Sequence, residues 1–107
     1  MRDIEEIMNT IDNWNGTFAE LANEFSIEEY RILFEEGWLE YVDDDWIEEK
    51  CYNTGDYAGM LYHFIGDWLM SYIAQGYTSK ATNNLFRLWN EGESYVVALA
   101  YERLKTC

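Results

Sequence analysis

Proline is absent from the 107 residues, and no apolar run approaches the length of a membrane-spanning helix. Proline breaks helices because its ring removes a backbone donor and clashes with the preceding turn, so its absence permits helices along the whole chain. A membrane span needs about 20 apolar residues. Residues 1–6 also lack the basic and apolar regions of a secretory signal. We therefore expect a cytoplasmic protein without membrane contact.

The residues of nucleophilic and metal chemistry are also scarce. His63 is the only histidine, and it lies between aromatic residues, where a core or boundary role is more typical than general-base catalysis. Cys51 and Cys107 are the only cysteines and form no Cys-x-x-Cys motif, so we expect free thiols. The aspartates 43–45 do not fit a calcium-binding loop, and no glycine-rich phosphate loop is present. We predict no enzymatic activity, no cofactor and no metal site.

Basic residues are few: seven Lys and Arg stand against 21 Asp and Glu, which gives a net charge of −14. Residues 1–56 hold 17 carboxylates and three cations, whereas residues 57–107 hold four of each and are neutral. Like charges in one region repel each other and cost stability, so this distribution indicates an anionic surface for a cationic partner. The alternative is a solvated face that only keeps the protein soluble.

Apolar residues, in contrast, are plentiful. Hydrophobic residues make up 49% of the chain and aromatic residues 18%, unlike the composition of disordered acidic proteins. A chain of this length usually forms one domain. We predict a single domain over residues 1–107, with a strongly acidic half (1–56) and a neutral, aromatic-rich half (57–107).

Apolar spacing in the first 37 residues is that of short amphipathic helices. Isoleucine or methionine occupies positions 4, 7, 8 and 11, which form one helix stripe. Thr17 with Glu20, and Ser26 with Glu29, have the spacing of capping boxes that begin two further helices. The side chains predicted to point inward from these two helices are Phe18, Leu21, Ala22, Phe25, Ile27, Tyr30, Leu33 and Phe34. Gly37 is expected to end or bend the third helix.

The rest of the chain continues the helical pattern. In residues 38–47 aromatic side chains alternate with carboxylates at spacings that place them on opposite sides of a helix. A long helix is expected over residues 56–75, closed by Gly76, and another from residue 78 or 79 to a stop at Gly92. Residues 94–105 fit a helix better than a strand, because their apolar spacing is nearer 3.6 than 2. The predicted fold class is all-α, a compact bundle of about five or six helices.

Residues 18–33 resemble a helix-turn-helix unit. Ala22 lies in the first helix and Ser26 stands where the turn glycine usually occurs. The second helix, however, carries one cation, Arg31, against the carboxylates Glu28, Glu29, Glu35 and Glu36. Phosphate contacts need Lys and Arg. We therefore expect a helix pair used for packing and no direct binding of nucleic acid.

Carboxylates three or four positions apart on a helix have Cβ atoms roughly 5–6 Å apart, comparable with the spacing of successive phosphates on a nucleic-acid strand. In length, charge and helical pattern the chain resembles the small acidic nucleic-acid mimics of phages and mobile elements, which include anti-restriction and some anti-CRISPR proteins. Its neutral second half differs from the more uniformly acidic members. The resemblance implies an inhibitor, active in the host cytoplasm, that blocks the cationic nucleic-acid-binding surface of a defence nuclease. The expected partner-binding residues are Glu28, Glu35, Glu36, Glu40, Asp43, Asp44, Asp45, Glu48 and Glu49.

The neutral half leaves a second hypothesis open. It is a protein-protein interaction or assembly module that binds through an aromatic surface, while acidity keeps it soluble. The aromatic residues considered for such a surface, or for a homodimer interface, are Trp68, Tyr72, Tyr77, Trp89 and Tyr95, although most of them are expected to lie in the core. The two hypotheses differ in salt sensitivity, because only binding through charge is screened by salt.

Overall fold

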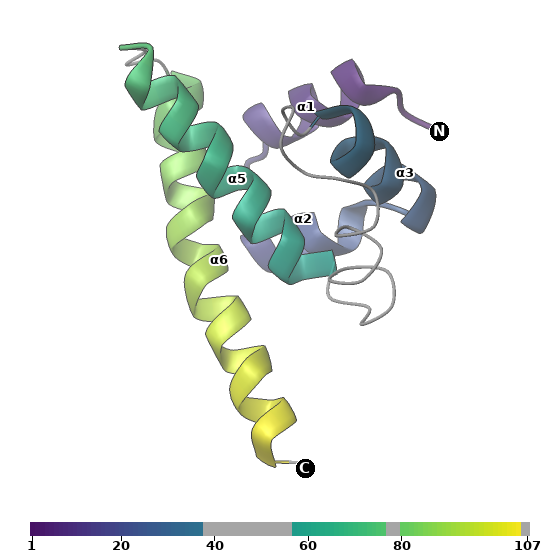
Figure 1. Cartoon of the computed structure of the whole chain (residues 1–107), viewed down its shortest axis with the longest axis vertical. Coiled ribbons are helices and arrows are strands. Elements are labelled where there is room, and N and C mark those ends of the chain that lie inside the picture. The colour runs from purple at the N-terminus through teal and green to yellow at the C-terminus, as the bar shows by residue number, and fades with distance from the viewer. Residues whose placement is uncertain (38–56, 77–79, 106–107) are drawn as a thin grey trace.

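The computed structural model describes residues 1–37, 57–76 and 80–105 (Figure 1). Its elements in chain order are α1 (Ile4–Asp12), α2 (Phe18–Glu24), α3 (Ile27–Ile32), the π-helical turn η1 (Leu33–Gly37), α5 (Tyr57–Ala74) and α6 (Lys80–Lys105). Within these ranges there is no β-strand. The predicted all-α class with about five or six helices is confirmed.

The three short N-terminal helices all begin with a capping box. The boxes predicted at Thr17 and Ser26 are confirmed: the backbone N–H groups of Glu20 and Glu29 each donate to the capping hydroxyl at 3.2 Å. A third box was missed, in which Asp3 Oδ1 accepts from the backbone N–H of Glu6 at 2.9 Å. Helices of six to nine residues are marginal alone, so these caps fix ends that packing then stabilises.

A change of helical geometry follows α3. The backbone passes from α to π geometry at Leu33, four residues before the glycine where the sequence predicted an end or bend. A Cβ atom on Gly37 would lie 2.9 Å from Ile4 Cδ1, so the glycine permits close approach of η1 to α1. This contact helps to hold η1 against the first helix.

The C-terminal end of α5 agrees with the sequence prediction to one residue. Gly76 has a φ of 78°, the left-handed conformation that favours glycine after a helix, and its N–H donates to the Ile73 carbonyl at 3.0 Å. The predicted N-terminal cap at Asp56 lies outside the described residues.

The prediction of two helices separated at Gly92 is wrong, as is the strand alternative for residues 94–105. One helix, α6, runs without interruption for 26 residues. A Cβ atom on Gly92 would lie 3.0 Å from ring atoms of both Phe18 and Tyr62. The glycine therefore serves close packing of α6 against two aromatic rings and does not end a helix.

The core lies between the α5–α6 helix pair and the short helices α1 to η1 (Figure 1). Its fully buried large side chains are Phe18, Phe34, Ile7, Ile11, Leu21, Leu33, Leu61, Ile65, Leu85 and Leu88. The inward positions predicted for the two helices that follow Thr17 and Ser26 are confirmed except for Ile27, which is 56% exposed. Ile27 is the first residue of α3, so its side chain lies beside the capped end and not over the core.

Candidate functional site

The first candidate site is the acidic unit, which we define as residues 1–37. It holds ten carboxylates and two arginines, a net charge of −8. Eight of these ten carboxylates are exposed: Asp3, Glu5, Glu6, Glu20, Glu24, Glu28, Glu35 and Glu36. The helices that carry them are fixed by capping boxes and by the core, so the charge is displayed on a folded surface.

Glu29 is one of the two carboxylates that are not exposed. It is only 8% exposed and accepts hydrogen bonds from the backbone N–H groups of Ser26 at 3.1 Å and Arg2 at 3.4 Å. Burial alone would raise its pKa, but these hydrogen bonds and the charge of Arg2 outweigh burial and hold the pKa below its ordinary value of 4.5. Glu29 is therefore a structural anion within the acidic unit.

Asp12 is the other carboxylate withdrawn from the surface. It is the last residue of α1, and its Oδ1 atom is buried with no hydrogen-bond partner among the described residues. Burial raises the pKa of the Asp12 carboxyl above its ordinary value of 3.8. A negative charge at a helix C-terminus also opposes the helix dipole. Asp12 thus costs stability and adds little to an exposed anionic array.

Arg2 forms ion pairs and a ring contact with residues of the acidic unit itself. Its guanidinium pairs with Glu24, lies 3.6 Å from Glu29 Oε2 and sits over the Phe25 ring at 5.5 Å from the centroid. The second cation, Arg31, is exposed on α3. One of the two positive charges therefore stabilises the join between the chain start and α2–α3, and the outward surface remains strongly negative.

The sequence-predicted partner-binding residues fall into two groups. Glu28 on α3 and Glu35 and Glu36 on η1 are exposed, as expected. The other six lie outside the described residues: Glu40, Asp43, Asp44, Asp45, Glu48 and Glu49. Because η1 is π-helical, the spacing between the first group's members departs from the regular α-helical register on which their prediction was based.

The helix pair that resembles a helix-turn-helix is tied together internally. The Tyr30 hydroxyl donates to the Ala22 carbonyl, and the rings of Phe25 and Tyr30 meet edge to face with centroids 5.6 Å apart. The exposed side of the second helix carries Glu28 and Arg31. Such a surface lacks the cluster of cations needed to hold a phosphate backbone.

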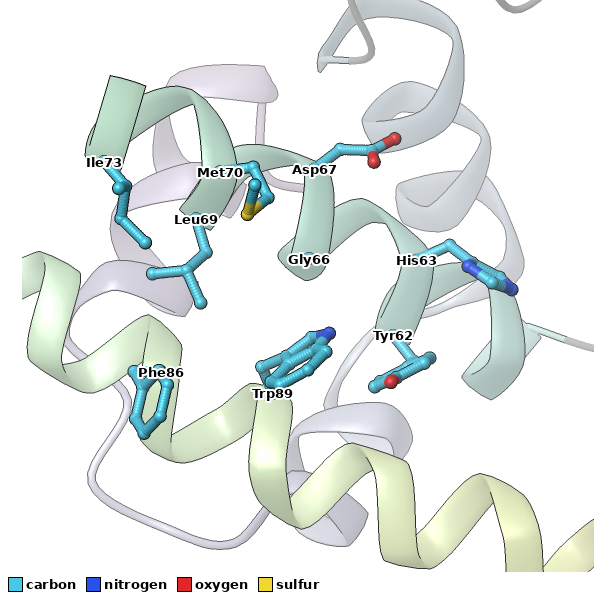
Figure 2. A pocket seen from close by; sticks show the side chains of 9 residues that line it. All are labelled: Tyr62, His63, Gly66, Asp67, Leu69, Met70, Ile73, Phe86 and Trp89. Atoms are coloured by element: carbon cyan, nitrogen blue, oxygen red, sulfur yellow. The ribbon is translucent and has the colours of Figure 1, made fainter. Parts of the chain in front are cut away.

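The second candidate site is a groove between the two long helices, which we call the α5–α6 groove (Figure 2). It has a volume of about 370 Å³. Its walls are formed by Tyr62, His63, Gly66, Asp67, Leu69, Met70, Ile73, Phe86 and Trp89. The side chains of Met70, Ile73 and Phe86 are 64%, 53% and 52% exposed. Large apolar side chains at the mouth of a groove are typical of a binding surface.

Close packing on one side of the groove depends on Gly66. Its missing Cβ leaves room for the Trp89 indole, whose Nε1 would lie 2.9 Å from a Cβ atom there. Trp89 in turn stacks on Tyr62 with centroids 5.8 Å apart and an interplanar angle of 12°. His63 was predicted to be a core or boundary residue, but it is exposed at the rim, beside Tyr62.

Most of the aromatic residues considered for an apolar surface were expected to lie in the core, and the described ones do pack against it, although Trp89 also lines the α5–α6 groove. Trp68, Tyr72, Trp89 and Tyr95 are partly buried and pack against the core, and Tyr77 lies outside the described residues. Among the described residues of the neutral half, the exposed large apolar side chains are Met70, Ile73, Phe86, Val97 and Tyr101. The sequence did not reveal this set, because the helix end expected at Gly92 separated Phe86 from Val97 and Tyr101, which lie on the same helix.

In the described part of the chain, no group of three or more His, Cys, Asp or Glu side chains is placed to bind a metal ion. None of the described helices combines the length and hydropathy needed to cross a membrane. No protein-family model matches the chain, and neither curated proteins nor solved structures gave a match.

Proposed function

We propose that this protein inhibits a nucleic-acid-binding protein, a restriction enzyme or CRISPR effector nuclease, by occupying its cationic surface with the acidic unit. The observation that carries the proposal is that eight of the ten carboxylates in residues 1–37 are exposed on capped, packed helices. A folded anionic surface loses less conformational entropy on binding than a disordered acidic segment does.

Charge supports this mode of binding in two further ways. Opposite charges on two surfaces raise the association rate and favour one orientation. The anions Glu28, Glu35 and Glu36 also lie on consecutive elements, so they can contact neighbouring cations of a phosphate-binding surface. Such an inhibitor competes with nucleic acid because both bind the same Lys and Arg side chains.

A matched pair of variants tests the proposal. One variant replaces Glu28, Glu35 and Glu36 with Gln; the control replaces three exposed carboxylates of the neutral half with their amides, at Asp67, Glu93 and Glu102. Both variants have the same net charge. Each is added to a panel of restriction endonucleases and CRISPR effector nucleases with their DNA substrates, at about 0.1 M and about 0.5 M salt, across which screening becomes much stronger.

We expect the unaltered protein to inhibit a nuclease of the panel at low salt, to be displaced by excess DNA, and to lose inhibition at high salt. The first variant should weaken inhibition about tenfold or more, which is about 1.4 kcal/mol, and the control should weaken it much less. Equal losses in the two variants would refute a localised acidic surface. No inhibition of any nuclease at low salt would refute the inhibitor proposal.

The α5–α6 groove favours the second candidate function, a module that binds another protein through apolar contacts. Binding of that kind persists at high salt, since it does not depend on charge. It would be lost on changing Phe86 to Glu and unaffected by the three changes in the acidic unit. Salt resistance together with that pattern of variants would replace the inhibitor proposal with the interaction module.

A further inference from the structure

The helix α6 extends well beyond the helix it packs against. At a rise of about 1.5 Å per residue, its 26 residues span roughly 39 Å and the 18 residues of α5 span roughly 27 Å. Figure 1 shows the C-terminal part of α6 projecting past the start of α5. A projecting helical segment buries less of its surface than one inside a bundle, so its apolar side chains need further cover.

Exposed apolar residues follow one stripe along α6. Phe86, Val97 and Tyr101 are separated by 11 and 4 residues, so at about 100° per residue they lie within about 60° of one another around the axis. Val97 is 63% exposed and Tyr101 59% exposed. Between Phe86 and Val97, the polar residues Asn90 and Glu93 occupy the same stripe and are also exposed. The stripe begins at the α5–α6 groove and continues onto the projecting part of the helix.

A different side of α6 holds the acidic unit. Asn84 Nδ2 donates to the Asp12 carbonyl at 2.9 Å, Glu91 Oε1 accepts from the Phe18 backbone N–H at 3.2 Å, and the Tyr95 ring lies 5.7 Å from the Phe18 ring. These α6 positions are seven and four residues apart, so they lie on one side of the helix, and Glu91 is about 120° from Val97 around the axis. The apolar stripe therefore faces away from the acidic unit.

The distribution of charge favours a second copy of this chain as the occupant. Residues 57–107 carry no net charge, whereas residues 1–56 carry −14. Two copies in contact through their neutral halves keep their acidic units apart, so repulsion between the two acidic halves is avoided, and the stripe itself brings in one carboxylate per copy, Glu93. A cationic foreign partner would gain nothing from this neutral surface.

We propose that the protein forms a two-fold symmetric dimer in which the α6 stripes pack antiparallel and Tyr101 of each copy inserts into the α5–α6 groove of the other. Phe86 and Tyr101 are 15 residues apart, about 22 Å along the helix. A two-fold axis between Glu93 and Ser94 relates the two antiparallel helices. It places Phe86 of one copy next to Tyr101 of the other, as a self-complementary interface requires. A tyrosine buries roughly 150–250 Å², and the groove of about 370 Å³ has room for one ring.

The oligomeric state tests the dimer with the full chain. Val97 and Ala98 are adjacent exposed residues of α6, but their side chains point about 100° apart. Sedimentation equilibrium is measured from about 1 to about 300 μM for the unaltered protein, Val97→Glu and the control Ala98→Glu. Helical circular dichroism verifies that each variant folds. We expect a dimer whose Kd rises about tenfold or more in Val97→Glu and changes little in Ala98→Glu.

Disulfide trapping tests the register. In a background with Cys51→Ser and Cys107→Ser, one variant carries Phe86→Cys and another Tyr101→Cys. Antiparallel packing predicts an intermolecular disulfide when the two variants are mixed and little when either is oxidised alone, because a disulfide needs Cα atoms within about 7 Å. Self-cross-linking of each variant would show parallel packing and overturn the proposed register.

Two further results would overturn the dimer itself. One is a monomer throughout the concentration range. The other is a dimer weakened equally by Val97→Glu and Ala98→Glu, which would place the interface off the stripe. Neither measurement involves a nuclease, so failure here leaves the proposed inhibition by the acidic unit independent and separately testable.

Discussion

Arg87 Nη1 donates to the carbonyl oxygen of Gly16 at 2.8 Å, and Nη2 donates to the carbonyl oxygen of Trp14 at the same distance. Arg87 also pairs with Glu91, whose other carboxylate oxygen accepts from the Phe18 backbone. A cation of the neutral half thus satisfies backbone groups between α1 and α2. These contacts fix the acidic unit on α6, so the acidic unit and the neutral half pack against each other.

Arg87→Ala should lower the free energy of unfolding by about 2 kcal/mol, because it leaves two loop carbonyls without their charged donor. Arg87→Lys should restore only part of this loss, since an ammonium group cannot reproduce the planar fork of a guanidinium. Urea unfolding followed by tryptophan fluorescence measures both values.

The control for this prediction is Lys80→Ala, which removes one positive charge from the exposed start of α6. It should change the unfolding free energy by less than about 0.5 kcal/mol. If Arg87→Ala is equally mild, the hydrogen bonds to Gly16 and Trp14 do not hold the acidic unit in place.

Local signals in the sequence predicted the helices well, and distant contacts explain where they failed. The capping boxes at Thr17 and Ser26 and the terminating Gly76 act within a few residues, so their spacing was sufficient. Gly92 gave the same local signal as Gly76, but its role depends on the rings of Phe18 and Tyr62, which are distant in sequence. A single sequence does not reveal such a contact.

The candidate sites were predictable to a similar extent. Net charge predicted an acidic half over residues 1–56, and exposure of most carboxylates in residues 1–37 follows because charged side chains rarely become buried. It could not show that Glu29 is withdrawn to meet Arg2, since that pairing joins residues 27 positions apart. The α5–α6 groove was missed because exposure at Met70 and Phe86 depends on how the two helices pack, which the apolar spacing of the sequence does not show.

Asp12→Asn should stabilise the protein at neutral pH by about 1 kcal/mol, because it removes a charge from a partly buried site at a helix C-terminus. Burial raises the pKa of Asp12 in the folded state above 3.8, so the folded protein binds this proton more tightly than the unfolded chain. The stabilisation by the protonated Asp12 carboxyl is therefore fully present below pH 3.8 and is lost as the pH rises through the folded pKa.

Chemical denaturation of the unaltered protein and of Asp12→Asn between about pH 3 and pH 7 measures how the stability difference depends on pH. The advantage of Asp12→Asn should be largest at pH 7 and shrink as the pH falls. Asp3→Asn is an unsuitable control because Asp3 caps α1, whereas Glu5→Gln changes an exposed carboxylate of the same helix. An advantage that is constant with pH would mean that the Asp12 charge is not its origin.

Glu29→Gln should have the opposite pH dependence. Gln can still accept the hydrogen bond from the Ser26 backbone, as in other capping boxes, but loses the attraction to Arg2. Because the pKa of Glu29 is below 4.5 in the folded state, its stabilisation is present above pH 4.5 and lost as the pH falls through the folded pKa. We expect a loss of about 1 kcal/mol at pH 7 that disappears in acid.

Glu20→Gln supplies the matched control, since Glu20 has the same position in the capping box of α2 and is exposed. It should cost less than Glu29→Gln at pH 7. Equal losses in the two variants would assign the role of Glu29 to helix capping alone and remove the contribution of Arg2.

Gly92→Ala distinguishes packing from helix propensity in α6. In an exposed helix interior, replacing glycine with alanine stabilises by about 1 kcal/mol. At Gly92 the new Cβ meets ring atoms of Phe18 and Tyr62 at 3.0 Å, and neither ring can move without disturbing the core, so we expect a net destabilisation of about 1 kcal/mol. Ser94→Ala, on the exposed surface two residues later, should be neutral or slightly stabilising. Thermal unfolding compares the two variants, and a stabilised Gly92→Ala protein would show that α6 lies farther from Phe18 than the close packing requires.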